Sequence, residues 1–589
     1  MSVLANLKGA TSLADLASIL GYKPSALSYI LYKIPDSAKY QKFTIPKSGG
    51  GEREICAPVE RLKTLQRHLA NVLYACRDKI DRESGLRPLS HAFRRAVIVT
   101  NDRRHKLSII TNARRHKRQR YVFNLDLQDF FPTFNFGRVR GFFIHNNDFK
   151  LNEKVATIIA QIACFENALP QGSPCSPVIA DLIAHLLDVR LAQLAKKHQL
   201  TYSRYADDLT FSTSRRDFPP SVAAPVTPES PQWAPGRELV KVIEKSGFVI
   251  NPTKTRMQFR MSRQLVTGLT VNAKVNIRPE YYRCARAMCH TLFGTGQYYR
   301  PLSVPDTEAE DGEDVKLEPV TSLNPLHGIL SHIHHVKDAI DDRPEPDKRK
   351  DATAARKLYA RFLKYRYFVR LDRPLIVCEG KTDNIYLKHA IRQLTDFHPK
   401  LGEWEDNSFK SAIRFFNYTG QAHKLLELGG GASDLKYFFI KNRYAEDVRG
   451  FKHRPLAHPV VILIDNDDGA DGKKGLFSTI KTNFNINIDF KSNDSFFHIT
   501  DNLYLVKTPG KGKKVKSCIE DFFDPKLLKT KWNGKKLNLK KDHGADGEYG
   551  KYVFAEKVVR PNADKIDFSG FKPLLERIVA VIDHYKSPE

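Results

Sequence analysis

The chain has 589 residues, of which 41% are hydrophobic and 27% are charged, a balance that allows several buried cores and excludes a single small binding module. Lys and Arg number 95 against 66 Asp and Glu, and the net charge of +29 favours a nucleic acid partner over an ordinary basic enzyme. The eight cysteines are scattered without the spacing of a zinc ribbon. Because no run of about 20 apolar residues and no signal peptide is present, we expect a cytoplasmic protein without membrane contact.

The first segment with a readable function is a Gly-rich turn between two cationic residues. In FTIPKSGGGEREICAP, at 43–58, Lys47 and Arg53 flank this turn. A flexible basic segment of this kind suits a cover over phosphate groups. A basic hairpin on the protein surface is the alternative interpretation.

Two acidic motifs follow within a mixed pattern of helices and strands. Asp126 ends an apolar run in YVFNLDLQDFF, with Asp129 after it, and Asp207 and Asp208 lie between two β-like segments in SRYADDLTFS. A nucleotidyl transferase holds two Mg²⁺ about 3.5 to 4 Å apart with carboxylate oxygens. Asp126, Asp207 and Asp208 are therefore candidate ligands of two such ions, although an isolated acidic pair in a turn is more often a solvated surface feature.

The middle of the chain contains two irregular segments and a helical region. We expect the Pro-rich stretch at 218–235 to be a surface insertion, and the acidic stretch at 304–319 to be a loop or linker. Helical periodicity covers 281–293 and 326–366.

Two short apolar runs in the last third, PLIVCEG and PVVILIDND, have the pattern of buried parallel strands. Glu379 follows the first run, and Asp465 and Asp467 follow the second. Because the carboxyl ends of parallel strands meet at one edge of a sheet, we expect these acids to converge and to bind Mg²⁺. The Lys-rich stretch at 507–517 is either a phosphate-binding segment or a solvated loop.

Four motifs, in this order along the chain, resemble conserved segments of reverse transcriptases. LDLQDFF and YADD are similar to the palm motifs, LPQGSPCSP, at 169–177, to the Gln-Gly segment, and 43–58 to the fingers. The resemblance implies that Asp126, Asp207 and Asp208 bind the catalytic metals. It also implies roles around the incoming nucleotide. Lys47 and Arg53 would neutralise the triphosphate, Asp129 would contact the triphosphate or sugar, and Phe131 would exclude a 2′-hydroxyl. Gln171 and Gly172 would contact the nascent base pair, and Lys254 would protonate the pyrophosphate.

Two further segments resemble signatures of the retron branch of these enzymes, TNARRH at 111–116 and LVTGLTVN at 265–272. This resemblance implies priming from the 2′-hydroxyl of a guanosine in the enzyme's own structured RNA and a branched RNA–DNA product, the multicopy single-stranded DNA (msDNA). Asn112 and His116 in the first signature have either an RNA-positioning role or a packing role.

The acids at the two later strand ends, with LGGGASDLKYF at 428–438 between them, resemble the TOPRIM domain of topoisomerases, primases and nucleases. The resemblance implies that Glu379, Asp465 and Asp467 hold one or two Mg²⁺, and it adds Glu520, in SCIEDFF, as an auxiliary acid of a nuclease. Lys551 is a further candidate, which could stabilise developing charge on phosphate, and a surface charge is the alternative for both residues. Hydrolysis is favoured because no topoisomerase tyrosine domain or primase zinc domain is recognisable. A non-hydrolytic module for nucleic acid binding and assembly is the alternative.

We therefore expect a multidomain α+β and α/β protein. The fingers and palm of a right-hand reverse transcriptase would cover 1–275, the thumb and connecting helices 276–370, and a Rossmann-like TOPRIM domain with a central parallel sheet 371–589. The expected function is msDNA synthesis coupled to a nuclease effector in bacterial anti-phage defence. The alternative, a mobile-element enzyme, is disfavoured because no RNA-maturation domain or integrating endonuclease motif is recognisable after the thumb. The expected partners are the cognate RNA, its msDNA, dNTPs and an RNA or DNA substrate of the TOPRIM domain, and a homo-oligomer is left open.

Overall fold

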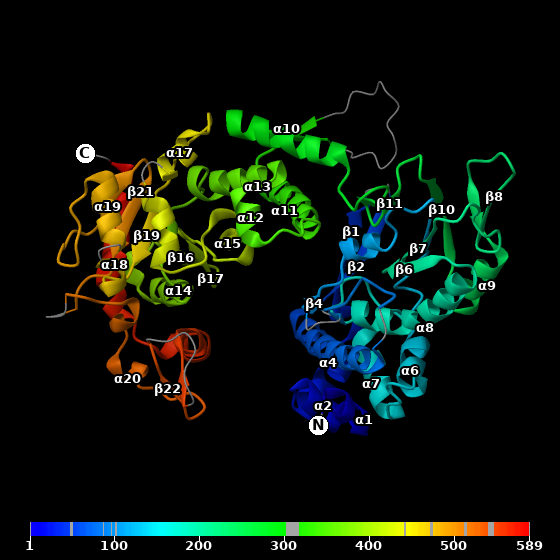
Figure 1. Ribbon diagram of the computed structural model, residues 1–589. Coiled ribbons are helices and arrows are strands. Elements are labelled where there is room, and N and C mark those ends of the chain that lie inside the picture. Colours follow the sequence, from blue (N-terminus) through cyan, green and yellow to red (C-terminus); the bar gives the residue numbers. More distant parts are fainter. Residues whose placement is uncertain are drawn as a thin grey trace. The chain divides into compact units, whose positions relative to one another are not determined.

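The computed structural model describes residues 2–47, 51–85, 88–95, 97–99, 103–301, 317–440, 443–471, 475–511, 515–539 and 547–587. The chain forms two compact units, one built mainly from residues up to Tyr281 and one built mainly from Tyr282 onward (Figure 1). None of the helices in the described ranges combines the length and the apolar character that a bilayer crossing requires.

The first unit is centred on a four-stranded antiparallel sheet with strand order β10-β5-β7-β6, and a separate hairpin, β1–β2, carries the Gly-rich turn. The strands of this unit are β1 (Tyr40–Pro46), β2 (Glu52–Pro58), β3 (Val97–Val99), β4 (Arg103–His105), β5 (Tyr121–Leu127), β6 (Thr201–Tyr205), β7 (Asp208–Thr213), β8 (Ala223–Pro225), β9 (Trp233–Pro235), β10 (Ile250–Phe259), β11 (Leu265–Val266) and β12 (Leu269–Thr270). Its helices are α1 (Val3–Gly9), α2 (Leu13–Leu20), α3 (Pro24–Ser28), α4 (Glu60–Ser84), α5 (Ile109–Arg114), α6 (Phe136–His145), α7 (Glu153–Ala163), α8 (Ser176–Lys197) and α9 (Arg237–Lys245).

One continuous apolar core joins this sheet to its helices. Phe123 of β5 and Phe211 of β7 are fully buried, and they belong to the same cluster as Leu187 and Leu191 of α8. The burial of apolar surface is the main stabilising contribution to such a core, and it amounts to about 25 cal/mol for each Å² that is removed from water. The sheet is therefore a rigid platform for the residues at the ends of its strands.

The Pro-rich stretch is a small hairpin with a buried base. Strands β8 and β9 pair antiparallel, and Phe218 and Val222 just before them are buried in the core of the first unit. The ring centroid of Phe218 lies 6.0 Å from that of Phe123. The predicted surface insertion is therefore correct for the mostly exposed tip at 226–232 and wrong for the base, because the apolar side chains there complete the core.

The second unit contains a five-stranded sheet with strand order β18-β15-β19-β21-β20. Its strands are β13 (Tyr298–Pro301), β14 (Leu317–Val320), β15 (Leu375–Cys378), β16 (Gly402–Glu405), β17 (Ser408–Ser411), β18 (Arg414–Phe415), β19 (Val460–Ile464), β20 (Phe497–Thr500), β21 (Leu503–Lys507), β22 (Lys536–Leu537) and β23 (Glu548–Tyr549). Its helices include most of α10 (Pro279–Thr295) and α11 (Asn324–Ala339), and further α12 (Glu345–Lys350), α13 (Ala354–Lys364), α14 (Asp383–Gln393), α15 (Gly420–Leu426), α16 (Ala432–Leu435), α17 (Arg443–Arg449), α18 (Asp468–Asp471), α19 (Leu476–Phe484), α20 (Pro525–Leu528), α21 (Lys551–Val553) and α22 (Lys572–Lys586).

Strands β18, β15, β19 and β21 of this sheet run parallel, and β20 joins β21 antiparallel at one edge. Every residue of β15 and β19 is buried, which confirms the prediction of buried parallel strands for both apolar runs. Ile376 of β15 packs in one cluster with Leu387 of α14 and Ile578 of α22. Parallel pairing brings the carboxyl ends of β15 and β19 to the same edge.

Three predicted segments lie partly outside the described residues: 48–50 of the Gly-rich turn, 304–316 of the acidic stretch and 512–514 of the Lys-rich stretch. The end of the acidic stretch was expected to be a loop, but Leu317–Val320 is strand β14, because it pairs antiparallel with β13.

Candidate active sites

The first acidic site lies at the tip of the β6–β7 hairpin and on the adjacent strand β5. The register of the sheet places Asp126 of β5 directly opposite Asp208 of β7. Asp207 lies in the turn after Ala206, whose φ of 56° is in the left-handed region, and the Asp207 carbonyl accepts a hydrogen bond from Leu127 N at 3.0 Å. The predicted hairpin that presents two acids is confirmed, and strand pairing adds Asp126 as the facing carboxylate.

These carboxylates crowd one another. Loss of surrounding water and then the charges of Asp207 and Asp126 raise the pKa of Asp208 to about 7, although its side chain reaches solvent. Burial and then the charge of Asp126 raise the pKa of Asp207. An excess of negative charge at one point is what a divalent cation neutralises.

Lys254 of β10 is the cation at this site. Its Nζ lies 3.0 Å from Asp126 Oδ2, and Asn251 Nδ2 donates to Asp126 Oδ1 at 3.4 Å. Although burial by itself would lower the pKa of Lys254, its hydrogen bond to Asp126 and the nearby carboxylate charges raise it. Lys254 is therefore held in its charged form against the acids.

A cavity of about 730 Å³ opens beside the acids and is lined by Asp126 and Asp207. Its volume is in the range of about 300 to 1,000 Å³ that is usual for small-molecule sites. The sequence-predicted nucleotide-binding residues that line it are Lys47, Arg53, Asp129, Phe131, Gln171 and Lys254.

The Gln171–Gly172 segment is packed tightly against β2. Cys56 N donates to the Gln171 carbonyl at 2.8 Å. A Cβ atom on Gly172 would lie 2.6 Å from the Cys56 carbonyl oxygen, and the φ of Gly172 is 124°. Only glycine allows this approach, and the approach holds Gln171 in the cavity wall.

Among the described residues, no three His, Cys, Asp or Glu side chains stand in an arrangement that would already hold a metal ion. The donor set at the first site nevertheless fits Mg²⁺, because Asp126 and Asp208 face each other across paired strands and carboxylate oxygens are its preferred ligands. Lys254 contacts one oxygen of Asp126, so ligation through that oxygen requires the ion pair to open.

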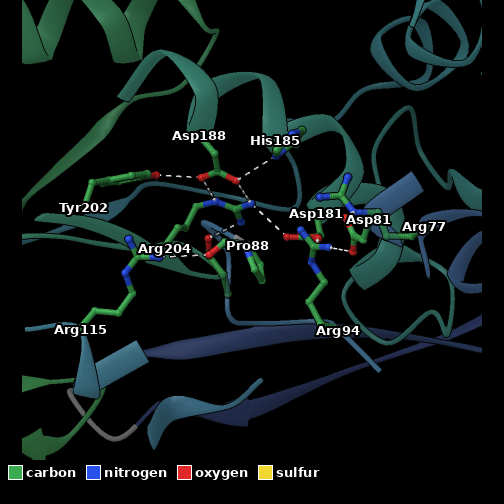
Figure 2. Close-up of polar contacts among 11 residues, drawn as sticks. Arg77, Asp81, Pro88, Arg94, Arg115, Asp181, His185, Asp188, Tyr202 and Arg204 are labelled. Carbon is green, nitrogen blue, oxygen red and sulfur yellow. Dashed lines mark hydrogen bonds and ion pairs between the residues drawn. The ribbon is translucent and has the colours of Figure 1, made fainter. Parts of the chain in front are cut away.

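A buried ion-pair network supports the hairpin from behind (Figure 2). Arg204 has no exposed surface and donates to Asp188 Oδ1 and Oδ2 at 2.7 Å each. It also donates to Asp181 at 3.0 Å and to the Ala206 carbonyl at 3.0 Å. Arg204 thereby ties the turn that carries Asp207 to helix α8.

The network extends beyond Arg204 to other elements of the unit. Arg94 lies 2.9 Å from Asp181, and Tyr202 donates to Asp188 at 2.8 Å. Burial by itself would raise the pKa of Asp181, but the guanidinium groups of Arg94 and Arg204 lower this pKa to about 2. Removing one partner of a buried pair leaves an uncompensated charge, so these contacts hold the turn in one place.

Asn112 and His116 lie inside the unit and have no exposed surface. The two ring nitrogens of His116 lie 2.7 Å from the hydroxyls of Ser203 and Ser212, and Ser203 donates to Asn112 Oδ1 at 2.7 Å. Burial and the nearby charge of Arg115 lower the pKa of His116 to about 3. These contacts with β6 and β7 favour the packing role over direct RNA contact.

The second retron-like segment contacts helix α5, which contains the start of the first. Thr267 and Gly268 form the turn between β11 and β12, with φ of 48° and 77°, and Thr267 Oγ1 donates to the Ile109 carbonyl at 3.1 Å. The two signatures therefore meet at helix α5.

The second acidic site lies at the carboxyl edge of the parallel sheet. Glu379 follows β15 and Asp465 follows β19. Asp465 N donates to Glu379 Oε2 at 3.1 Å, and Ile519 N donates to Asp465 Oδ1 at 2.9 Å. The predicted convergence of these two strand ends is confirmed.

Asp467 and the Gly-rich turn flank Glu379. Asp467 Oδ1 accepts a hydrogen bond from Gly469 N at 2.8 Å. Burial, and to a smaller degree the charge of Asp467, raises the pKa of Glu379 despite the amide hydrogen bond from Asp465. Gly431 N donates to the Glu379 carbonyl at 2.9 Å, so the turn within 428–438 packs beside this residue.

Two further acids complete the site. Glu520 is fully buried, its Oε2 lies 3.0 Å from Lys551 Nζ, and its Oε1 has no hydrogen-bond partner among the described residues. Asp383, which the sequence analysis missed, accepts a hydrogen bond from Gly380 N at 2.7 Å. Burial and then the charge of Glu520 raise the pKa of Asp383 to about 7.

The charge balance of this second site resembles that of the first. Burial and then the charges of Asp383 and Glu520 raise the pKa of Asp465 well above its usual value, against the opposing effect of Lys551. One lysine therefore faces several carboxylates, and this donor set also fits Mg²⁺.

Residues 45–271 match the protein family described as reverse transcriptase (RNA-dependent DNA polymerase). Retron Ec86 reverse transcriptase from Escherichia coli is 31% identical over 293 residues, which cover 48% of this chain and 78% of that protein. Retron Mx65 and Mx162 reverse transcriptases from Myxococcus xanthus are each 31% identical, over 47% and 54% of this chain and 62% of each relative. Among solved structures, apo telomerase from Candida tropicalis aligns at 14% identity with a TM-score of 0.30, covering 56% of this chain and 58% of that chain, which is too weak to support an argument.

Proposed function

The chain belongs to the family of retron reverse transcriptases, and on that premise we propose that its first unit copies a structured cognate RNA into msDNA. The observation that carries this proposal is the register of Asp126 opposite Asp208 beside the 730 Å³ cavity. The primer would be the 2′-hydroxyl of a guanosine in that RNA, and the product would be branched.

In this proposal Asp126, Asp207 and Asp208 would hold two Mg²⁺, and the chemistry that such ions would supply is activation of the attacking hydroxyl and stabilisation of the leaving pyrophosphate. The dense negative charge of the three acids is the supporting observation. The Arg204 network keeps the turn that carries Asp207 in place, so the carboxylates do not have to be ordered when the ions bind.

The cavity wall supplies the contacts with the incoming dNTP. Lys47 and Arg53 from the β1–β2 hairpin neutralise its triphosphate. Phe131, whose ring centroid lies 6.0 Å from that of Phe93, fills the space beside the sugar and excludes a 2′-hydroxyl. Lys254, once released from Asp126, is the residue that donates a proton to the leaving pyrophosphate.

The test of the polymerase proposal is the double variant Asp207→Ala, Asp208→Ala, assayed for dNTP incorporation on the copurified cognate RNA. We expect a loss of about 1,000-fold, because several kcal/mol of charge stabilisation is removed from the transition state. Asp217→Ala, at an exposed acid just beyond β7, is the matched control and should retain full synthesis. Wild-type extension by a folded double variant would overturn the assignment.

For the second unit we propose a Mg²⁺-dependent nuclease of the TOPRIM type. The supporting observation is the hydrogen bond from Asp465 N to Glu379 Oε2 at the carboxyl edge of parallel strands, with Asp383, Glu520 and Lys551 close by. In this proposal Glu379, Asp465 and Asp467 hold one or two ions, which would polarise a phosphodiester and activate water. Lys551 stabilises the developing negative charge on phosphate.

The test of the nuclease proposal compares wild type with Glu379→Ala after the bound DNA has been removed, on single-stranded RNA, tRNA and duplex DNA. RNA is the substrate we expect first, and DNA second. Glu379→Ala should lose cleavage and retain msDNA synthesis, while the exposed Glu403→Ala should retain both. Absence of cleavage by wild type with every divalent metal would favour the alternative of a non-hydrolytic binding and assembly module.

The two activities suggest a defence system in a bacterial host. The reverse transcriptase with its RNA and msDNA would act as a sensor, and the second unit as an effector that is restrained until the msDNA is damaged. Cells that carry the wild-type protein should arrest growth on phage infection, whereas cells with Glu379→Ala should not. Equal growth of the two strains during infection would contradict the effector role.

A further inference from the structure

A cavity of about 430 Å³ in the second unit has a cationic rim and an apolar floor. Leu375, Ile391 and Ile413 belong to its apolar lining, and the cations that line it are Arg366, Lys388, Arg392 and Arg414. The lining residues include no carboxylate. A cavity with this composition has an unbalanced positive charge, and it is not part of either acidic site.

Two of the cations are placed on one helix without a neutralising partner. Lys388 and Arg392 are exposed and one helical turn apart on α14, a spacing at which like charges repel. Within the described part of the chain, neither side chain makes an ion pair. Lys388 Nζ lies 5.5 Å from the ring centroid of Phe415 and the Arg392 guanidinium 5.8 Å from that of Phe409, so aromatic rings of the cavity wall hold both cations in place.

Arg366 adds an unsatisfied donor to the same cavity. Its Nη2 donates to Asn324 at 2.8 Å, but its Nη1 is buried and has no hydrogen-bond partner among the described residues. Because Nη1 has almost no accessible surface, the contribution of Arg366 to a bound anion would be the positive charge of its guanidinium group beside the cavity. Arg414 is ion-paired with Asp372 at 2.8 Å and therefore adds less net charge.

We propose that this cavity binds a nucleoside phosphate. The cationic rim is suited to the phosphate, whose oxygens accept hydrogen bonds from guanidinium and ammonium groups. The apolar floor includes the half-buried rings of Phe409 and Phe415, which are suited to the planar base, and the volume is in the usual range for a ligand of this size. A bare inorganic anion would leave this apolar floor without a contact.

The cavity is separate from the acidic site of the same sheet. Leu375 is the first residue of β15 and lines the cavity, whereas Glu379 follows the last residue of that strand. At about 3.3 Å per residue, Leu375 and Glu379 are roughly 13 Å apart along the chain. The inference therefore does not rest on the proposed polymerase or nuclease activity, and either could fail without affecting it.

The test is calorimetric titration of the full chain, freed of bound nucleic acid and kept in EDTA, with adenosine monophosphate and with a 5′-phosphorylated oligo(dT). The double variant Lys388→Gln, Arg392→Gln should bind these probes at least tenfold more weakly than wild type does, because it lacks two phosphate contacts. Lys452→Gln, which removes an exposed cation elsewhere in the second unit, is the matched control and should bind as wild type does. Both altered side chains of the double variant are exposed, so its fold should be unchanged by circular dichroism.

The two probes distinguish the source of the nucleotide. Binding of adenosine monophosphate would show that a free nucleotide is sufficient, and binding of the oligonucleotide alone, lost without its 5′-phosphate, would identify a strand end. The proposal is overturned if neither probe binds, if the double variant binds as tightly as wild type, or if inorganic pyrophosphate binds as tightly as the nucleotide. Photo-crosslinking with 8-azidoadenosine monophosphate should label peptides within 388–417, and labelling confined to the first unit would also overturn it.

Discussion

The two acidic sites of this chain are supported in opposite ways. At the first site Asp126 and Asp207 face an open cavity, and the supporting contacts lie behind them, where Arg204 is bonded to Asp188. At the second site main-chain amides bond directly to the carboxylates, as Asp465 N does to Glu379. At the first site Asp126 therefore accepts hydrogen bonds from the side chains of Lys254 and Asn251, whereas at the second site Glu379 accepts one from a main-chain amide.

This difference follows from the strands that carry the acids. A hairpin tip has no further strand pairing to hold it, so buried charges behind β6 and β7 take that role. Parallel strands that end at one edge leave free amides beyond their last residues, and these amides reach the adjacent carboxylate. We therefore expect the first site to be sensitive to remote charge changes, and the second to changes in its own charge balance.

Arg204→Gln should break the support of the first site and have the largest effect. It leaves Asp188 buried without its guanidinium partner and leaves Asp181 with Arg94 but without Arg204, so the free energy of unfolding of the first unit should fall by about 3 to 5 kcal/mol. DNA synthesis by the folded fraction should fall by about 100-fold, because the turn that carries Asp207 is released. Turnover and affinity for the cognate RNA are measured separately, and turnover should fall while affinity stays near wild type.

Arg215→Gln is the matched control for this variant, because Arg215 is an exposed guanidinium that is bonded to Gln199 and takes no part in the network. If Arg204→Gln and Arg215→Gln behave alike, the turn is not held from behind. Equal protection of β19 amides from hydrogen exchange in both variants would confirm that the second unit is unaffected.

Lys551→Gln tests the second site in the same way. Glu520 is fully buried, so loss of its 3.0 Å partner should destabilise the second unit by about 3 kcal/mol. The measurement is hydrogen exchange of β19 and β21 amides, which should speed up. The double variant Glu520→Gln, Lys551→Gln should recover most of the loss, and a double variant as unstable as the single one would show that packing rather than charge balance is responsible.

The His116 contacts give the first unit a pH dependence opposite in sign to that of the second site, where burial raises the pKa of Asp383 to about 7. Because the pKa of His116 is lowered from 6.5 to about 3, the unfolded chain takes up this proton before the folded chain does. The stability that neutral His116 contributes is complete above pH 6.5 and is lost as pH falls toward 3. Between pH 7 and pH 5 the loss should be about 2 kcal/mol.

This prediction is tested by urea unfolding of wild type and His116→Gln at the two pH values. The variant should be less stable at pH 7, and its stability should fall less on acidification. His145→Gln, at an exposed histidine of α6, should keep the wild-type pH dependence. Parallel pH curves for wild type and His116→Gln would contradict the assignment.

Phe131→Ala should have the smallest effect, because Phe131 lines the cavity of the first site and its proposed role is to exclude a 2′-hydroxyl. Removal of the ring should raise ribonucleotide incorporation by about tenfold, which corresponds to about 1.4 kcal/mol of lost discrimination. The measurement is competition between dNTPs and rNTPs on one template. Phe259→Ala, at an exposed aromatic outside the cavity lining, should leave the ratio unchanged, and an unchanged ratio for Phe131→Ala would remove it from this role.

The strands and acids at strand ends could be predicted because their signals are local. An apolar run followed by an acid defined β15 with Glu379 and β19 with Asp465, and the hairpin around Asp207 followed from two β-like segments with a turn between them. In each case the strand and the acid that follows it are neighbours in the sequence.

The supports of both sites could not be predicted because their partners are far apart in the sequence. Arg204 reaches Asp188 and Asp181 of α8, and the available signal was only that two acids lie two helical turns apart in the largely apolar first half of that helix. Asp383 was missed because an acid in the first turn of a helix is ordinarily read as a helix-dipole contact. Its proximity to Glu520 depends on the packing of the whole second unit.

The β8–β9 hairpin has a practical consequence for work on this enzyme. Pro225 and Trp233 are paired residues, so the chain leaves and returns at points about 5 Å apart, with the mostly exposed tip at 226–232 between them. An epitope or a fluorescent domain whose own ends lie close together can be spliced into that tip without altering the buried base at Phe218. Such an insertion would provide a handle for immobilising or tracking the polymerase while both ends of the chain stay unmodified.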